Sequence, residues 1–334
     1  MILPSIDERT LRSLVTSADA VAAVREAFRA DGEGRTAVPA VINLPIPGTR
    51  GEFHVKTAWV AGVPLIAVKV ASGFYDNPAL GLPTGSGLMA LFDAATGMPL
   101  GLLFDNGFLT DIRTGAAGAV AADCLARRDV DTVGVIGSGV QARFQIACLR
   151  EVRRFRRLVA WSLDAPGLDA YCREMRDAYG LEAIAAAGPE AVCRQADVLI
   201  TATPSTAPIV RAEWLRPGLH ITALGSDTPG KQECDAACLG RADLVVVDRL
   251  SQCARFGELS HALAAGVMRE ADVWAQLGEV VAGARPGRTG DDQITICDLT
   301  GVGFQDTAIA AFAWFRVREN GLAEEARPVS RGDV

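Results

Sequence analysis

One stretch constrains the fold more than any other: residues 133–142, which read Val-Gly-Val-Ile-Gly-Ser-Gly-Val-Gln-Ala. This order of strand, tight turn and helix matches the G-x-G-x-x-G/A dinucleotide fingerprint. In that pattern Gly137 makes the turn, Gly139 lets the backbone approach a pyrophosphate, and Ala142 packs the helix against the strand. The phosphates are expected at the helix N-terminus, where free N–H groups and the helix dipole favour negative charge. The alternative is a structural glycine turn that binds no ligand.

Strand and helix patterns alternate around this turn. Helical patterns cover 141–150 and 168–179. Short apolar runs typical of buried strands lie at 132–136, 158–161, 198–202, 220–223 and 244–247, with a last one from 294. This alternation predicts an α/β fold with a doubly wound parallel sheet, a Rossmann domain over residues 116–304.

The residues before this domain follow a different pattern. A helical stripe covers 18–32, and prolines and glycines then separate short strand-like segments. Those segments are 53–60, 65–70, 88–92 and 100–104. They predict an antiparallel sheet in an α+β domain, which we assign to residues 1–115 together with 305–334. An amphipathic helix over 306–318 is expected in its C-terminal part.

Charge and cysteine content argue against several classes of function. The net charge of −7 disfavours a nucleic-acid surface, and the densest basic patch, Arg153–Arg157, is interpreted as a solvated helix end. No apolar run approaches the ~20 residues of a membrane helix, and no signal-peptide pattern opens the chain. Eight cysteines without a C-x-x-C pair and three separated histidines predict no metal site and a cytoplasmic location.

Three cations stand out among apolar neighbours. For Lys56 the favoured interpretation is a strand side chain that points to water, whereas Lys69, which precedes a glycine-rich turn, is better placed to meet an anionic ligand. Arg113 needs a partner, because a buried unpaired charge is costly. A carboxylate or phosphate of a ligand would supply one. The alternative is an internal ion pair with Asp105 or Asp111.

The expected carboxyl ends of the parallel strands carry further candidates, because ligands bind there in open α/β sheets. Asp164 is the best match for the carboxylate that bonds the ribose hydroxyls, and the absence of an arginine in its turn favours NAD over NADP. Thr203 follows the strand at 198–202. The loop 223–231 contains Asp227, a candidate proton carrier whose alternative role is an Asx turn.

Three motifs in this order resemble the ornithine cyclodeaminase/μ-crystallin family. They are Leu109–Thr114 with the alanine-rich helix after it, Gly137–Ala142, and Gly225–Lys231. The resemblance covers about residues 15–320. The segment Val55–Ala58, with Lys69 and Gly73–Pro78, is similar to a bacterial subgroup that includes ectoine-utilisation proteins and iminosuccinate reductases.

The resemblance implies a homodimer whose N-terminal domain builds the dimer sheet, with an amino-acid or imino-acid substrate between the domains. Lys69 and Arg113 would hold the substrate carboxylate, with Lys56 as a further substrate contact, and Asp227 would exchange a proton with the amine or imine. The implied cofactor contacts are Thr84, Thr114, Gly137, Gly139, Val140, Gln141, Ala142, Asp164, Thr203, Leu224, Gly225 and Lys231.

Two departures from the family pattern concern the substrate. Pro39 is followed by Ala40–Asn43 where an arginine is common, and Leu299–Thr300 replaces a usual serine. Both disfavour ornithine. We therefore expect an NAD-dependent imine reductase or amino-acid dehydrogenase, with iminosuccinate as a candidate substrate. A cyclodeaminase with catalytic NAD and a non-catalytic NAD(P)-dependent binding protein are the alternatives.

Overall fold

The computed structural model describes residues 3–322, which form two compact units. Unit 1 contains the chain up to Arg113 and from Val302 onward, and unit 2 is Thr114–Gly301. The sequence places these boundaries at 115/116 and 304/305. The end of the predicted first domain, residues 323–334, lies outside the described residues.

Unit 1 is built on a mainly antiparallel sheet in the order β1-β7-β6-β5-β4-β2, with β3 also paired to β4. Only β1 and β7 run parallel. The strands are β1 (Ser5–Asp7), β2 (Thr36–Ala37), β3 (Ile42–Ile46), β4 (Gly51–Val60), β5 (Leu65–Phe74), β6 (Gly85–Asp93) and β7 (Pro99–Phe104). The helical elements are α1 (Glu8–Leu14), α2 (Ser17–Gly32), the short 3-10 helix η1 (Asn77–Leu80) and α11 (Gly303–Glu319).

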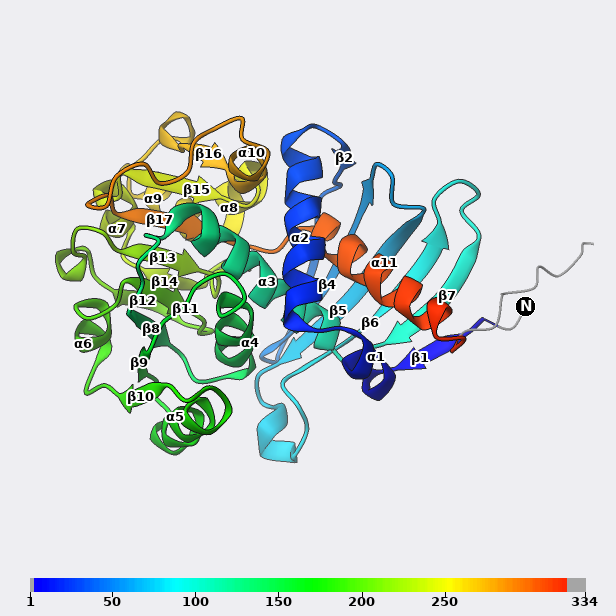
Figure 1. The fold of residues 1–334 in the computed structure, drawn as a ribbon, viewed down its shortest axis with the longest axis horizontal. Helices are drawn as coiled ribbons and strands as arrows, with labels where there is room; N and C mark the ends of the chain where they lie inside the picture. The colour runs from blue at the N-terminus through cyan, green and yellow to red at the C-terminus, as the bar shows by residue number, and fades with distance from the viewer. Residues whose placement is uncertain (1–2, 323–334) are drawn as a thin grey trace, which may run out of the picture. The chain divides into compact units, whose positions relative to one another are not determined.

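Helix α11 covers one face of this sheet, beside α2 (Figure 1). Its first turn lies close to β4, because a side chain at Gly303 would collide with the carbonyl oxygen of Thr57. Thr307 donates a hydrogen bond to the carbonyl oxygen of Ala58 at 2.8 Å. Phe28 of α2 and Phe304 pack edge to face, with ring centroids 5.2 Å apart. These contacts hold the N-terminal turn of α11 over β4 and β5.

Unit 2 contains a parallel sheet in the order β10-β9-β8-β11-β13-β17-β15-β16, which confirms the Rossmann prediction. Its strands are β8 (Thr132–Ile136), β9 (Arg157–Trp161), β10 (Glu182–Ala185), β11 (Val198–Thr201), β13 (His220–Ala223), β15 (Leu244–Val247), β16 (Ala275–Gln276) and β17 (Thr295–Asp298). A separate parallel pair is β12 (Thr206–Val210) with β14 (Gln232–Cys234). Strands β10, β12, β14 and β16 were not predicted from the sequence, and β14 and β16 have only three and two residues.

Helices surround the strands of this unit. They are α3 (Phe108–Leu125), in which the unit boundary falls, α4 (Val140–Leu149), α5 (Ala165–Tyr179), α6 (Pro189–Cys193), α7 (Ala236–Arg241), α8 (Leu250–Phe256), α9 (Glu258–Ala264) and α10 (Leu277–Val281), with short 3-10 turns η2 (Ala212–Trp214) and η3 (Glu270–Asp272). No helix among residues 3–322 is long and apolar enough to cross a membrane.

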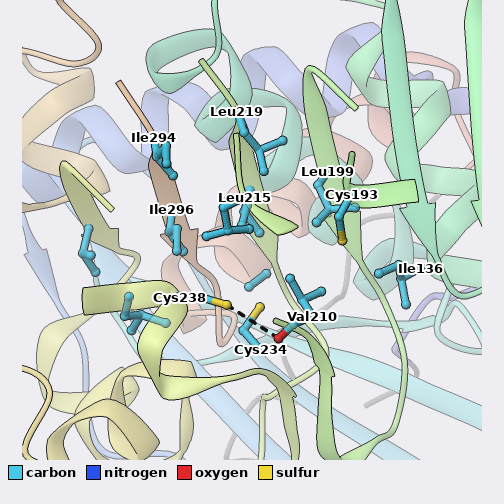
Figure 2. Close-up of a cluster of buried hydrophobic side chains, with 14 of the residues drawn as sticks. Ile136, Cys193, Leu199, Val210, Leu215, Leu219, Cys234, Cys238, Ile294 and Ile296 are labelled. Atoms are coloured by element: carbon cyan, nitrogen blue, oxygen red, sulfur yellow. Dashed lines mark hydrogen bonds between the residues drawn. The ribbon is translucent and has the colours of Figure 1, made fainter. Parts of the chain in front are cut away.

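An apolar core joins the strands of unit 2 to their helices (Figure 2). Ile136, Leu199 and Ile296 come from three different strands, and all are fully buried. Cysteines contribute as small apolar residues, and Cys238 donates a weak hydrogen bond from Sγ to the carbonyl oxygen of Val210 at 3.6 Å. All eight cysteines are free thiols.

The basic patch at Arg153–Arg157 is not simply a solvated helix end. The Arg153 side chain is only 11% exposed and pairs with Asp123. It also donates to the carbonyl oxygens of Ala122, Asp123 and Arg127. The last turn of a helix leaves carbonyl oxygens without intrahelical partners, and a guanidinium can satisfy several of them at once. Arg153 therefore caps the C-terminal end of α3.

Candidate functional site

The glycine turn of unit 2 has the geometry that the fingerprint requires. Gly137 has a φ of 111°, and a Cβ there would lie 2.6 Å from the carbonyl oxygen of Ala202. Gly139 is the N-cap of α4, and no atom lies within 4 Å of the position a Cβ would take. Ala142 is fully buried and Val140 is exposed. The backbone at Gly139 can therefore be approached closely by a ligand, next to the positive end of the α4 dipole.

Arg143 supports this turn, a role that the sequence analysis missed. Its Nη1 atom donates to the carbonyl oxygens of Ser138 at 2.7 Å and Gly139 at 3.1 Å. Its Nε atom donates to Glu174 at 2.8 Å. Because these carbonyls are held from within the helix, the turn is fixed before any ligand arrives. The sequence feature that could have revealed this role is a basic residue in the first turn of the helix that follows the two glycines.

Asp164 has a structural role in addition to its predicted one. It is the N-cap of α5, and its Oδ1 atom accepts a hydrogen bond from the Gly167 N–H at 3.2 Å. It follows the end of β9, the strand beside β8. Its contact with a ribose stays a prediction.

The loops after β11 and β13 are held together by a buried carboxylate. Glu233 Oε1 accepts hydrogen bonds from the Thr203 N–H at 2.6 Å and the Thr203 hydroxyl at 2.7 Å. Its Oε2 accepts from the Gly225 N–H at 2.8 Å. Leu224 precedes Gly225 and is buried. Strands β8, β11 and β13 are neighbours and parallel, so the glycine turn, Thr203 and Gly225 lie at one edge of the sheet.

Asp227 lies in the loop that follows Gly225 and pairs with Lys231 at 2.8 Å. Its side chain is 41% exposed, whereas that of Lys231 is 11% exposed. The carboxylate thus contacts the side chain of Lys231, four residues further along the loop. Ser226 and His261 each hydrogen-bond the carbonyl oxygen of Lys231, at 2.6 Å and 2.8 Å. The loop is fixed around an accessible carboxylate.

Unit 1 gathers the three predicted cations around one carboxylate, and we call Lys56, Lys69, Arg113 and Asp306 the cationic cluster. Lys56 and Lys69 face each other across β4 and β5. Lys69 Nζ donates to Asp306 Oδ1 at 2.9 Å, and Arg113 Nε lies 2.9 Å from the same oxygen. Arg113 Nη1 donates to Gln305 Oε1 at 2.9 Å. The first turn of α11 therefore brings Gln305 and Asp306 to the cations.

One expectation and one alternative about these cations were wrong. Lys56 does not point to water but is 6% exposed, because its register opposite Lys69 places it on the sheet face covered by α11. The internal partner of Arg113 is Asp306 rather than Asp105 or Asp111. Asp105 instead accepts a hydrogen bond from the Leu109 N–H near the start of α3.

Burial controls the charges in the cationic cluster. It lowers the pKa of Lys69 to about 7, and the charge of Arg113 acts in the same direction while Asp306 opposes it. The pKa of Asp306 is below its usual value: Arg113 and Lys69 outweigh its burial. Buried atoms without a hydrogen-bond partner among the described residues include three from this region: Asp105 Oδ1, Gln305 Nε2 and Asp306 Oδ2. Such atoms are rare in folded proteins, so the region suits a polar ligand or water.

The two threonines predicted to contact the cofactor lie in different units. Thr84 precedes β6 in unit 1, where its carbonyl oxygen accepts from the Phe74 N–H at 2.8 Å. Thr114 begins unit 2 within α3, and its carbonyl oxygen accepts from Gln145 Nε2 at 2.9 Å. Gln141, on the first turn of α4, is half-buried. The contacts of these side chains with a cofactor stay predictions.

Comparison with known proteins agrees with these features. Residues 7–321 match the model of the ornithine cyclodeaminase/mu-crystallin family. A putative dehydrogenase of Rhizobium meliloti is 46% identical over 93% of this chain and 94% of its own length.

Two solved structures superpose on nearly the whole chain. An archaeal alanine dehydrogenase dimer with bound NAD has a TM-score of 0.91 at 35% identity, covering 98% of this chain and 100% of its own. The iminosuccinate reductase of Paracoccus denitrificans with NAD+ has a TM-score of 0.88 at 31% identity, covering 98% and 99%. The chain belongs to the ornithine cyclodeaminase/mu-crystallin family.

Proposed function

We propose that this protein is an NAD(H)-dependent imine reductase or amino-acid dehydrogenase. It exchanges a hydride between nicotinamide and the Cα of a small amino or imino acid. The observation that carries the proposal is the cationic cluster, in which Lys56, Lys69 and Arg113 are buried around one carboxylate. Cations gathered in this way suit a substrate that brings its own carboxylate.

The turn at Gly137–Ala142 and the loops at Thr203 and Gly225 would hold NAD, since Gly139 is open to close approach and begins a helix. When bound, this cofactor supplies the hydride acceptor or donor. The relatives solved with bound NAD support the choice of cofactor. The first turn of α5 has no basic residue that could pair with a 2′-phosphate.

Side chains of the protein would bind the substrate and transfer the proton. Lys69 and Arg113 would bind the substrate carboxylate and so fix the orientation of Cα, which is the proximity contribution to catalysis. Asp227, half-exposed and paired with Lys231, would take a proton from the amine as it becomes an imine and return it in the reverse direction. Oxidation of the amino acid thus yields imine, NADH and a proton.

A dicarboxylic imino acid such as iminosuccinate is the substrate that we favour. Lys56 adds a third positive charge beside Lys69, so the cationic cluster can match two substrate carboxylates. The relative from Paracoccus denitrificans is an iminosuccinate reductase. The reduction product would be aspartate.

The test is NADH oxidation followed at 340 nm with ammonium and a series of keto acids. Oxaloacetate, which gives iminosuccinate with ammonium, is expected to be turned over faster than pyruvate. Turnover of pyruvate alone would contradict the dicarboxylic substrate but retain the reductase. Ammonia release from ornithine without net NADH change would identify a cyclodeaminase. NADH binding without turnover of any of these would indicate a binding protein.

We also propose a homodimer formed through the face of the unit 1 sheet opposite α11. Aromatic and aliphatic side chains are exposed there, including Phe53, Trp59 and Phe104. A groove of about 340 Å³ lies between Phe53 and Phe104 on this face. Exposed apolar surface of this kind is typical of protein–protein contacts. Light scattering should give twice the chain mass, and Phe53→Asp should shift the protein towards monomer.

A further inference from the structure

Glu233 is a buried carboxylate that joins two loops at the carboxyl edge of the unit 2 sheet. It lies on β14 and is fully buried. One of its oxygens accepts two hydrogen bonds from Thr203, and the other accepts one from the Gly225 N–H. All three partners are donors. Only an ionised carboxylate can accept on both oxygens at once without offering a proton of its own.

The two loops that Glu233 joins are packed against each other and against the glycine turn. A side chain at Gly225 would collide with the carbonyl oxygen of Thr203 and with the Glu233 carboxyl group. A side chain at Gly137 would collide with the carbonyl oxygen of Ala202. Backbone therefore touches backbone from the turn to Thr203 and from Thr203 to Gly225. A small displacement of one loop must move the next, because the backbone atoms are too closely packed to shift independently.

A second buried carboxylate holds Glu233 in place. Glu258 accepts hydrogen bonds from the N–H groups of Glu233 at 2.8 Å and Cys234 at 3.1 Å. Burial raises the pKa of both carboxyl groups, and each negative charge disfavours the other. Within residues 3–322, neither carboxylate forms an ion pair with a cation. Such an arrangement costs folding free energy, so a role other than stability accounts for it better.

We propose that Glu233 is a positioning residue for the dinucleotide, one that sets the separation of the Thr203 and Gly225 loops. This inference rests on the proposed NAD-dependent function. Glu233 is fully buried and would act through the two loops that are proposed to hold the cofactor, while Glu258 fixes the strand on which Glu233 lies. The nicotinamide half of the cofactor is the part that these loops would bind, because they follow the central strands β11 and β13.

The test is Glu233→Gln in the full chain, with the affinity for NADH measured by fluorescence titration of the resting protein. The amide keeps the size of the side chain but places an NH2 group against either the Thr203 donors or the Gly225 N–H. One loop must then move. We expect the Kd for NADH to rise about tenfold or more, and the KM for NADH to rise more than kcat falls. The melting temperature should change little, because the variant also removes a buried charge.

Two further variants make the result decisive. Glu190→Gln, at an exposed carboxylate of the same unit that pairs with Arg194, should leave the NADH affinity unchanged. Glu233→Asp keeps the charge but is one methylene too short to reach both loops, so it should also weaken NADH binding. Unchanged NADH affinity in both Glu233 variants would overturn the inference, as would an affinity loss that only follows a loss of folded protein. A wild-type protein that binds no NADH would refute the proposed function itself.

Discussion

The two units of this protein bury charge in opposite ways. In unit 1, Lys56, Lys69 and Arg113 surround one carboxylate, Asp306. In unit 2, Glu233, Glu258 and Asp298 are buried and pair with no cation of residues 3–322, and each accepts hydrogen bonds from backbone N–H groups. An excess of buried cations suits a ligand that brings negative charge. Buried carboxylates satisfied by backbone donors instead fix the positions of loops.

The same chemical change should therefore have opposite effects in the two units. Asp306→Asn removes the carboxylate that pairs with Lys69 and Arg113, and it should reduce the free energy of unfolding by about 3–5 kcal/mol at pH 6. The loss should be smaller at pH 9, because Lys69 has a pKa of about 7 and can release its proton. Urea unfolding at both pH values measures this.

A matched control lies in the same unit. Asp76 pairs with Arg50 on the surface, where both side chains are largely exposed. Asp76→Asn should change the free energy of unfolding by less than about 1 kcal/mol. If the two variants were equally stable, Asp306 would not be the partner on which the buried cations depend.

Asp227 belongs to neither class of buried charge, since it is half-exposed and has a cationic partner. Asp227→Ala should reduce kcat by about 10²–10³-fold, because a positioned proton carrier contributes that much. The Kd for NADH and the melting temperature should stay as in the wild type. Steady-state kinetics and an NADH titration measure both. Asp169→Ala, at an exposed position of α5, is the control, and a fully active Asp227 variant would remove this residue from the mechanism.

The contrast between the units also explains what sequence reasoning could predict. Gly137, Gly139 and Ala142 act within one local turn, so their spacing is enough to place them. The partner of Arg113 could not be found in this way. Asp306 is 193 positions away in the numbering (306 − 113), and only the packing of α11 on β4 and β5 brings it near.

The sheet face on which a strand side chain lies, and the burial of a single acidic residue, were equally hard to predict from the sequence. Lys56 was expected to face water, because a lysine within a strand does not reveal which face its neighbours will cover; the register with Lys69 decides that. Glu233 and Glu258 are single acids without a motif, and Glu233 lies on a three-residue strand that was not predicted. Their burial follows from tertiary packing and not from local pattern.

Replacing Asp298 tests whether a carboxylate buried in unit 2 lowers the stability of the protein. Burial raises its pKa from 3.8 to about 7, so between these values the folded protein binds a proton that the unfolded chain has lost. The free energy of unfolding should therefore fall as the pH rises from about 4 to 7 and then level off. Asp298→Asn imitates the neutral acid and can still accept from the Leu259 N–H. It should be about 4 kcal/mol more stable than the wild type at pH 8, and equal to it near pH 4.

Melting temperatures of both proteins across this pH range measure the effect. Asp243→Asn is a suitable control, because Asp243 also accepts a backbone hydrogen bond, from the Ile294 N–H at 2.7 Å, but is itself an exposed residue. The same dependence on pH in the wild type and in Asp298→Asn would show that burial does not raise the pKa of Asp298, so that its charge is buried without a cost in stability.

The smallest expected effect concerns Lys69 and the substrate. Since its pKa is lowered to about 7, Lys69 loses its charge as the pH rises through that value, and it should then bind a substrate carboxylate less well. The KM for the imino acid should rise several-fold from pH 6.5 to 8.5 while the KM for NADH stays constant. Lys69→Arg keeps the charge at both pH values, so its KM should be nearly independent of pH, even if the bulkier guanidinium raises it overall. Equal pH profiles in the two proteins would mean that the charge of Lys69 serves Asp306 alone, and that the carboxylate of the substrate is bound elsewhere.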